Sequence, residues 1–158
     1  TLSVAAAGAS PVPGGASAEE AVKAAFVFNF AKLTTWPASE SSGPIVIGII
    51  GSGGTGEAIE RVVNGKTANG RTINVKSVAA GAAKSCHIVF VCGSGGPPSV
   101  GSDPVLTVGE SGGFTGQGGA IGLVSDGGKV KIELNKKAVK KAGLSVDSKL
   151  EAIAKVVG

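Results

Sequence analysis

AAFVFNFAKLTTWP, residues 24–37, is the stretch that decides the fold of this chain. It holds the only Trp and three of the five Phe in a protein with few aromatic residues. Its apolar residues repeat at helical spacing, at Val22, Phe26, Phe30 and Leu33. We therefore predict an amphipathic helix that starts near Ser17, with Ser17 and Glu20 as a capping box. Pro37 ends it, because the residue before a proline disfavours the α region.

The composition indicates one folded unit behind a short N-terminal segment. Hydrophobic residues make up 42% of the 158 residues, which is enough for one core. Residues 1–18 are uncharged and rich in small residues and proline, so we expect a flexible segment that is a linker or the remnant of a signal peptide. Residues 19–158 are then a single α/β domain. No apolar run approaches the ~18 residues that span a bilayer, so we expect no direct membrane insertion.

Strand and helix patterns alternate along this domain. Apolar runs at 45–50, 88–91 and 105–108 and an alternating pattern at 71–78 predict strands. We expect a hairpin of 120–124 with 129–134, and helical segments at 57–63, 79–84, 135–142 and from Ser145 to Val157. Asn135 is the expected cap of the third of these helices. The fold class is therefore α/β: a single-domain mixed sheet of about six strands, with a parallel core and an antiparallel C-terminal hairpin, flanked by helices.

A glycine-rich loop follows the first strand. Gly51, Ser52, Gly53 and Gly56 fit the G-x-G-x-x-G spacing, between a strand and a helix, which is typical of dinucleotide-binding loops. The strand that ends at Val78 lacks the acidic residue that would hold a ribose, and a chain with 27 glycines produces such spacings by chance. A nucleotide- or phosphate-binding loop and a tight structural turn both remain open at this point.

Reactive side chains do not gather into a pattern. Cys86 and Cys92 lie about 20 Å apart if the residues between them form a strand, whereas a disulfide needs Cα atoms within about 7 Å. We therefore predict no disulfide between them. His87, the only histidine, is expected at a strand start near the surface, and neither a metal site nor a catalytic pair is predicted. We expect a protein that is not an enzyme and holds no cofactor.

Basic residues are concentrated near the C-terminus. Eight of the fifteen Lys and Arg residues lie between 129 and 155, all of them lysines, with no aromatic residue among them. Nucleic-acid sites favour Arg and stacking aromatics, so we expect no nucleic-acid partner. A solvated helix face is the simpler interpretation, and a face for an acidic partner is the alternative.

Several segments together resemble the YfiR-like family of small exported bacterial proteins. The family pattern Lys-Ala-Ala-Phe-x-Tyr-Asn-Phe-x-Lys-Phe-x-x-Trp-Pro is matched at 23–37, where Phe28 replaces the usual Tyr. Further matches lie at 65–71, 86–91, 105–108, 114–122, 133–135 and 142–150, in the family's order. The resemblance covers residues 19–155.

The resemblance implies a periplasmic, non-catalytic regulator. Such a protein binds the periplasmic domain of a membrane sensor, such as a diguanylate cyclase, represses it and lowers cyclic-di-GMP signalling. The resemblance also implies a homodimer. The helical stripe turns Phe26 and Phe30 to the core, so we expect the partner-binding residues to be Phe28, Asn29, Lys32 and Trp36.

Overall fold

The structure is a computed structural model that describes residues 18–37, 43–51, 53–93, 95–98, 103–126 and 129–157. Its helices are α1 (Ala18–Leu33), α2 (Gly54–Val63), η3 (Ala80–Ser85), η4 (Thr115–Gln117), α3 (Lys136–Lys141) and α4 (Ser148–Ile153). Its strands are β1 (Thr34–Thr35), β2 (Ile45–Ile50), β3 (Thr67–Ala68), β4 (Arg71–Ser77), β5 (Ile88–Val91), β6 (Leu106–Gly109), β7 (Ile121–Asp126), β8 (Lys129–Asn135), β9 (Ser145–Val146) and β10 (Ala154–Val157). None of these described helices is long and apolar enough to cross a membrane.

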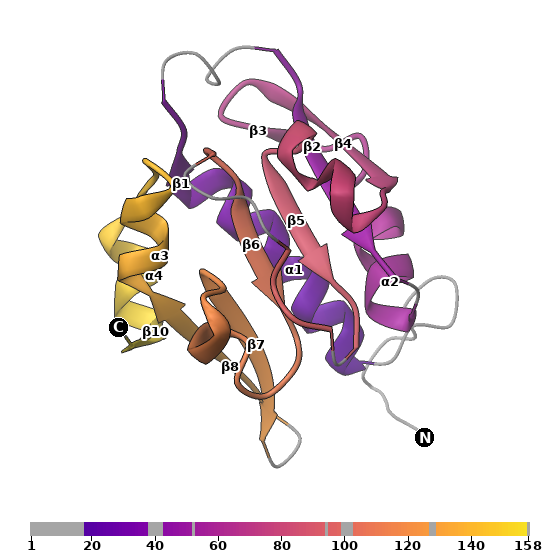
Figure 1. Ribbon diagram of the computed structural model, residues 1–158. Helices are drawn as coiled ribbons and strands as arrows, with labels where there is room; N and C mark the ends of the chain where they lie inside the picture. Colours follow the sequence, from indigo (N-terminus) through magenta and orange to yellow (C-terminus); the bar gives the residue numbers. More distant parts are fainter. Residues whose placement is uncertain are drawn as a thin grey trace.

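Eight strands form the main sheet, in the order β10-β8-β7-β6-β5-β2-β4-β3 (Figure 1). The adjacent pairs β4-β2, β2-β5, β5-β6 and β6-β7 are all parallel. β3 pairs antiparallel with β4, and β7 pairs antiparallel with β8, the latter as the hairpin pattern predicts. The mixed α/β fold is thus confirmed, with two strands more than the six expected. The small strands β1 and β9 pair with each other outside this sheet.

The extra strands lie at the two ends of the sheet. β10 pairs in parallel with β8, so the C-terminal helix ends at Ile153 and does not continue to Val157 as its apolar spacing suggested. The β-branched Val156 and Val157 fit a strand, and the free edge of β8 offers them a ladder of hydrogen bonds. At the other end, Asn69 (φ 53°) and Gly70 (φ 78°) form the two-residue turn that joins β3 to β4.

The structure shows where α1 ends and which residue caps α3. α1 ends at Leu33, three residues before Trp36, because Thr34 and Thr35 pair with β9. The predicted cap at Ser17 lies outside the described residues. Asn135 caps α3 as expected, since its side chain accepts a hydrogen bond from the backbone N–H of Ala138 at 3.2 Å.

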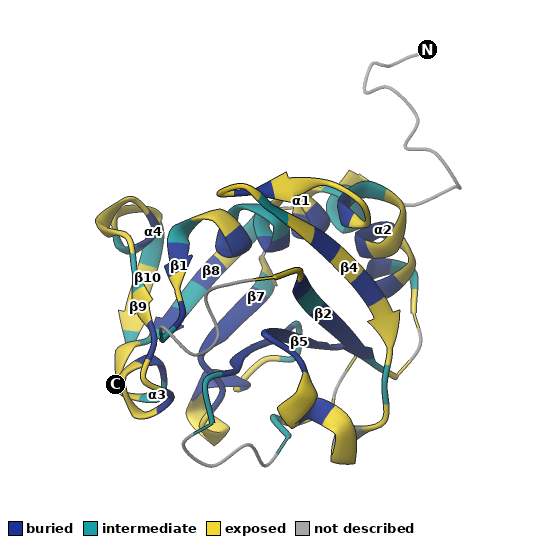
Figure 2. Cartoon of the chain, turned by 90° about the horizontal axis from the view of Figure 1, so that it is seen from above, coloured by how far each residue is buried: buried dark blue, intermediate teal, exposed yellow. Residues whose placement is uncertain are grey.

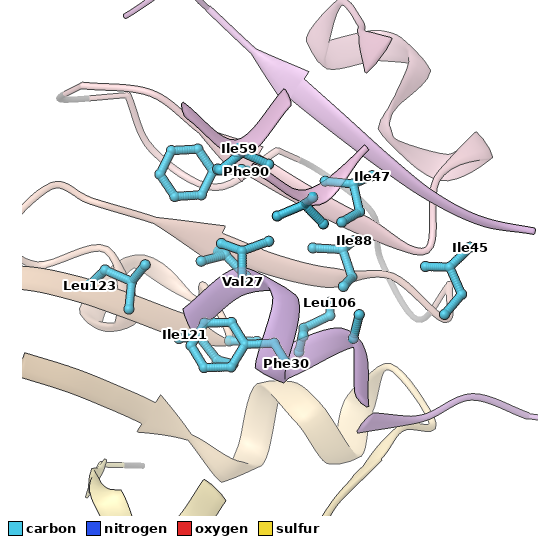
Figure 3. Packing of buried hydrophobic residues seen from close by; sticks show 14 of the residues in the cluster. Val27, Phe30, Ile45, Ile47, Ile59, Ile88, Phe90, Leu106, Ile121 and Leu123 are labelled. Carbon is cyan, nitrogen blue, oxygen red and sulfur yellow. The ribbon is translucent and has the colours of Figure 1, made fainter. Parts of the chain in front are cut away.

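The larger core lies between the sheet and the pair α1 and α2, which pack together on one face (Figure 2). Figure 3 shows the Phe30 ring of α1 beside the sheet residues Ile121 and Leu106, and Val27 belongs to the same core. The other face carries a smaller core that contains Cys86, Val89, Val91 and Phe114. Successive residues of β5 therefore belong to different cores, which is why its sequence is apolar throughout.

Candidate partner-binding surface

The outer side of α1 carries an aromatic ring between two cations. Phe28 is half-buried, and the Nζ atoms of Lys32 and Lys66 lie 5.1 and 6.0 Å from its ring centroid. Both lysines are exposed, and the half-buried Asn29 is adjacent in the chain. We call these four residues, Phe28, Asn29, Lys32 and Lys66, the Phe28 patch. Its charge and half-buried ring can contact an acidic surface that also offers an apolar group.

Lys66 belongs to this patch although no sequence pattern predicts its position there. The β3–β4 hairpin brings it to α1, and Asn69 fixes the hairpin by donating a side-chain hydrogen bond to the carbonyl of Lys32 at 2.9 Å. The link joins residues that are 37 positions apart. Only the tertiary fold sets this distance, so helical periodicity alone could not have found Lys66.

Trp36, by contrast, is not at the surface. It is only 5% exposed and belongs to the larger core. Its indole Nε1 donates to the carbonyl of His87 at 3.1 Å, and its ring meets the His87 ring edge-on at 5.9 Å. The expected surface position of Trp36 is therefore wrong, because α1 ends early and the extended residues after Leu33 turn the indole inward. A buried tryptophan of this kind anchors the fold.

His87 is also buried, where a surface position was expected. Its Nδ1 accepts a hydrogen bond from the backbone N–H of Val46 at 3.0 Å. Arg71 approaches Nε2 at 3.4 Å and donates from Nε to the carbonyl of Gly43 at 2.7 Å. Trp36, Arg71 and His87 thus come from three motifs of the family pattern and meet at one structural junction between α1, β4 and β5.

A carboxylate lies at the N-terminus of α2, next to the glycine-rich loop that joins β2 to α2. Ser52 lies outside the described residues, while Gly51, Gly53 and Gly56 are described. The carboxylate of Glu20 occupies the space that a Cβ at Gly54, the first residue of α2, would need. A small cavity of about 250 Å³ beside the loop is lined by two further carboxylates, Glu57 and Glu60. Negative charge at these positions opposes phosphate binding, which favours the structural turn.

A buried ion pair lies where β2, β5 and β6 end. Lys23 of α1 is 6% exposed, and its Nζ lies 3.0 Å from Oε1 of Glu110. Glu110 also accepts from the hydroxyl of Thr55 at 2.9 Å and from the backbone N–H of Gly93 at 2.7 Å. Open α/β sheets bind ligands outside the carboxyl ends of their strands. Here the chain's own lysine and hydroxyl occupy that position, so the pair joins α1 to the sheet.

No sequence motif predicts the pair of Lys23 and Glu110. One feature could have indicated it: Lys23 is a charged residue four positions before Val27 and seven before Phe30, on the buried stripe of the helix. A buried lysine requires an acidic partner. The sequence contains no comparable sign that the partner is Glu110.

Cys86 and Cys92 are free, buried thiols that belong to different cores. Burial raises the pKa of the Cys92 thiol, and the negative charge of Glu110 raises this pKa further. A hydrogen bond from the backbone of Gly56 has the opposite, smaller effect. Burial likewise raises the pKa of the Cys86 thiol. A hydrogen bond with the Ser85 side chain and the positive charge of Lys76 lower this pKa by smaller amounts. A protonated thiol is a poor nucleophile and a poor metal ligand. Among the described residues, no three His, Cys, Asp or Glu side chains are grouped as metal ligands would be.

The chain resembles a known protein family over nearly its whole described length. A search of curated proteins finds no match to the chain. A family model described as YfiR/HmsC-like matches residues 20–155. This range includes all of α1 except its first two residues, the junction of Trp36, Arg71 and His87, and every strand of the main sheet except the last two residues of β10. A match over this much of the chain shows that the protein belongs to the YfiR/HmsC-like family.

Proposed function

We propose that this protein is an exported, non-catalytic regulator that binds the periplasmic domain of a membrane sensor, such as a diguanylate cyclase, and represses it. Membership of the YfiR/HmsC-like family supports this class of function. Repression of a cyclase lowers cyclic-di-GMP signalling. The regulator acts as a homodimer in this proposal.

The observation that carries the proposal is the Phe28 patch. A half-buried aromatic ring with two exposed lysines over it combines apolar area with positive charge. Aromatic residues dominate the binding energy of protein interfaces, and complementary charge steers the encounter. Phe28, Asn29 and Lys32 therefore form the partner-binding surface, together with Lys66. Trp36 supports the surface from below, since it holds the end of α1 to β5.

Binding to recombinant periplasmic domains of diguanylate cyclases from the same genome tests the proposal. Phe28→Ala is expected to weaken binding by about tenfold or more, as expected for an aromatic anchor. Lys32→Glu combined with Lys66→Glu is expected to slow association and to invert its salt dependence. Lys149→Glu combined with Lys155→Glu is the charge-matched control, because both lysines are exposed and lie outside the Phe28 patch.

The cyclic-di-GMP level in cells tests whether binding of the partner also represses it. Expression of the wild-type protein with its cyclase is expected to lower cyclic-di-GMP, and expression of Phe28→Ala at the same level is expected not to. If Phe28→Ala binds and represses like the wild type, the Phe28 patch is not the interface. If no periplasmic sensor domain binds the wild type at all, the proposed function fails.

A further inference from the structure

A cavity of about 540 Å³ lies on the face of the sheet opposite α1 and α2. β6, η4, α3 and the residues Pro97 and Pro98 enclose it. Thr107 of β6 lies between Leu106 and Val108, which point into the larger core, so its side chain points to this opposite face. The cavity shares no residue with the Phe28 patch, and its volume is in the range of pockets that hold small organic molecules.

The positive charge of this cavity has no internal counter-ion. Lys137 and Lys141, one turn apart on α3, both line it, and none of its lining residues is acidic. Among the residues that the structure describes, neither lysine makes an ion pair, whereas the neighbouring Lys136 pairs with Glu151 at 3.7 Å. Two like charges at this spacing destabilise a helix slightly. A bound anion with two negative charges would balance them.

The interior of the cavity adds a hydroxyl donor in a fixed position. Thr107 is 4% exposed, and its Oγ1 accepts a hydrogen bond from the backbone N–H of Ala120 at 2.9 Å. Its hydroxyl proton has no acceptor among the described residues and remains available to a ligand. Asn135 forms part of the wall and is held rigidly, because it donates to the carbonyl of Thr115 at 3.1 Å while it caps α3.

The remaining walls are apolar and suit an organic body. Pro97, Pro98, Val105, Ala138 and Ala142 line the cavity together with the polar residues. Lysine ammonium groups act as point charges, and they bind compact anionic groups such as phosphate without the planar geometry that arginine requires. A phosphate ester or an aromatic dicarboxylate has the required combination of two charges and an apolar part.

We propose that this cavity binds a small organic dianion, with its charged end at Lys137 and Lys141 and its apolar body against the prolines and alanines. The Thr107 hydroxyl donates to the same ligand. The proposal does not depend on the regulatory function, because it concerns a different face of the molecule. It gives the basic C-terminal region a defined role, where the sequence alone favoured a solvated helix face.

Isothermal titration and backbone amide NMR shifts of the full chain at pH 7.5 test this proposal. The probes are phenyl phosphate and phthalate, with benzamide as the neutral analogue and inorganic phosphate as the anion without an apolar body. At least one organic dianion is expected to bind about tenfold or more tightly than both analogues, and to shift the amides of Thr107, Gln117 and Asn135. The proposal is overturned if neither dianion binds, or if either analogue binds as tightly.

Charge-matched variants locate the site. Lys137→Gln with Lys141→Gln is expected to lower the affinity for the bound dianion by about tenfold or more. Lys136→Gln with Lys140→Gln removes the same charge from the same helix, and neither side chain lines the cavity. We expect this variant to change affinity by less than about threefold, because both lysines are exposed and their charge is screened by dissolved ions. Equal losses in the two double variants would show a general charge effect and no site. Thr107→Val is expected to weaken binding, and Thr107→Ser, which keeps the hydroxyl, is expected to restore most of it.

Discussion

At the scale of single residues, Phe114 and two glycines explain why the loop before β7 is so rich in glycine. The Phe114 ring is completely buried and lies directly against Gly109 and Gly119, where an added Cβ would overlap it. Gly118 between them has φ 102°, which other residues rarely adopt. Gly109 and Gly119 therefore serve the packing of Phe114, and Gly118 serves the turn.

Gly109→Ala or Gly119→Ala is expected to destabilise the protein by about 1–3 kcal/mol, because the new methyl group must displace the Phe114 ring from a filled core. Urea unfolding measures this change. Gly112→Ala is the control, since nothing lies within 4 Å of an added Cβ there and its φ is not in the left-handed range. A loss for Gly112→Ala as large as that for Gly119→Ala would contradict this explanation.

The buried thiols predict a loss of stability in alkali. Burial raises the pKa of both Cys86 and Cys92 in the folded state, so they stay protonated where the thiols of the unfolded chain ionise. Their contribution to stability is present below the ordinary thiol pKa of about 8.5 and is lost as pH rises through the raised folded values. The free energy of unfolding should fall between pH 8 and 10. It should fall less steeply in a Cys86→Ala, Cys92→Ala variant, and equal slopes would contradict the prediction.

At the scale of secondary-structure elements, the buried pair of Lys23 and Glu110 holds α1 to the sheet. Lys23→Met leaves the Glu110 carboxylate buried without its counter-charge, so we expect a loss of about 3–5 kcal/mol in unfolding free energy. Adding Glu110→Gln should recover part of this loss, because an amide needs no counter-charge. Lys84→Met breaks the exposed pair with Asp103 and should cost less than about 1 kcal/mol. Similar losses for Lys23→Met and Lys84→Met would show that the pair is not effectively buried.

Most elements could be predicted from local patterns, and the exceptions depend on distant partners. The strand 88–91 and the Asn135 cap were found because apolar runs and capping residues act locally. β10 was missed because helical spacing continued past Ile153, and only the free edge of β8 makes the strand more stable. The early end of α1 has the same cause, since β9 is more than 100 residues away in the chain.

At the scale of the whole molecule, the single tryptophan reports on the entire fold. Trp36 contacts the end of α1 and the start of β5, and it belongs to the core that also contains residues of β7 and β8. We expect blue-shifted emission that moves to the red in one transition, coincident with loss of far-UV circular dichroism. Two separate transitions would mean that the junction of Trp36 and His87 opens before the sheet unfolds.

The candidate sites were less predictable than the fold. Phe28 and Lys32 are neighbours on one helix, so periodicity places them together, but Lys66 joins them only through the β3–β4 hairpin. The cavity with Lys137 and Lys141 needs β6, η4 and α3 in their final positions. Trp36 misled the sequence analysis because a tryptophan at a helix end suits an interface as well as a core.

The burial of Lys23 has one further consequence, which concerns dissolved salt. Ions screen exposed charges over about 8 Å at physiological ionic strength and reach a buried pair far less. The contact between Lys23 and Glu110 should thus persist at high salt, while the proposed contact of Lys32 and Lys66 with a partner should weaken. A change in the salinity of the surroundings would then loosen the proposed complex and leave the protein itself folded.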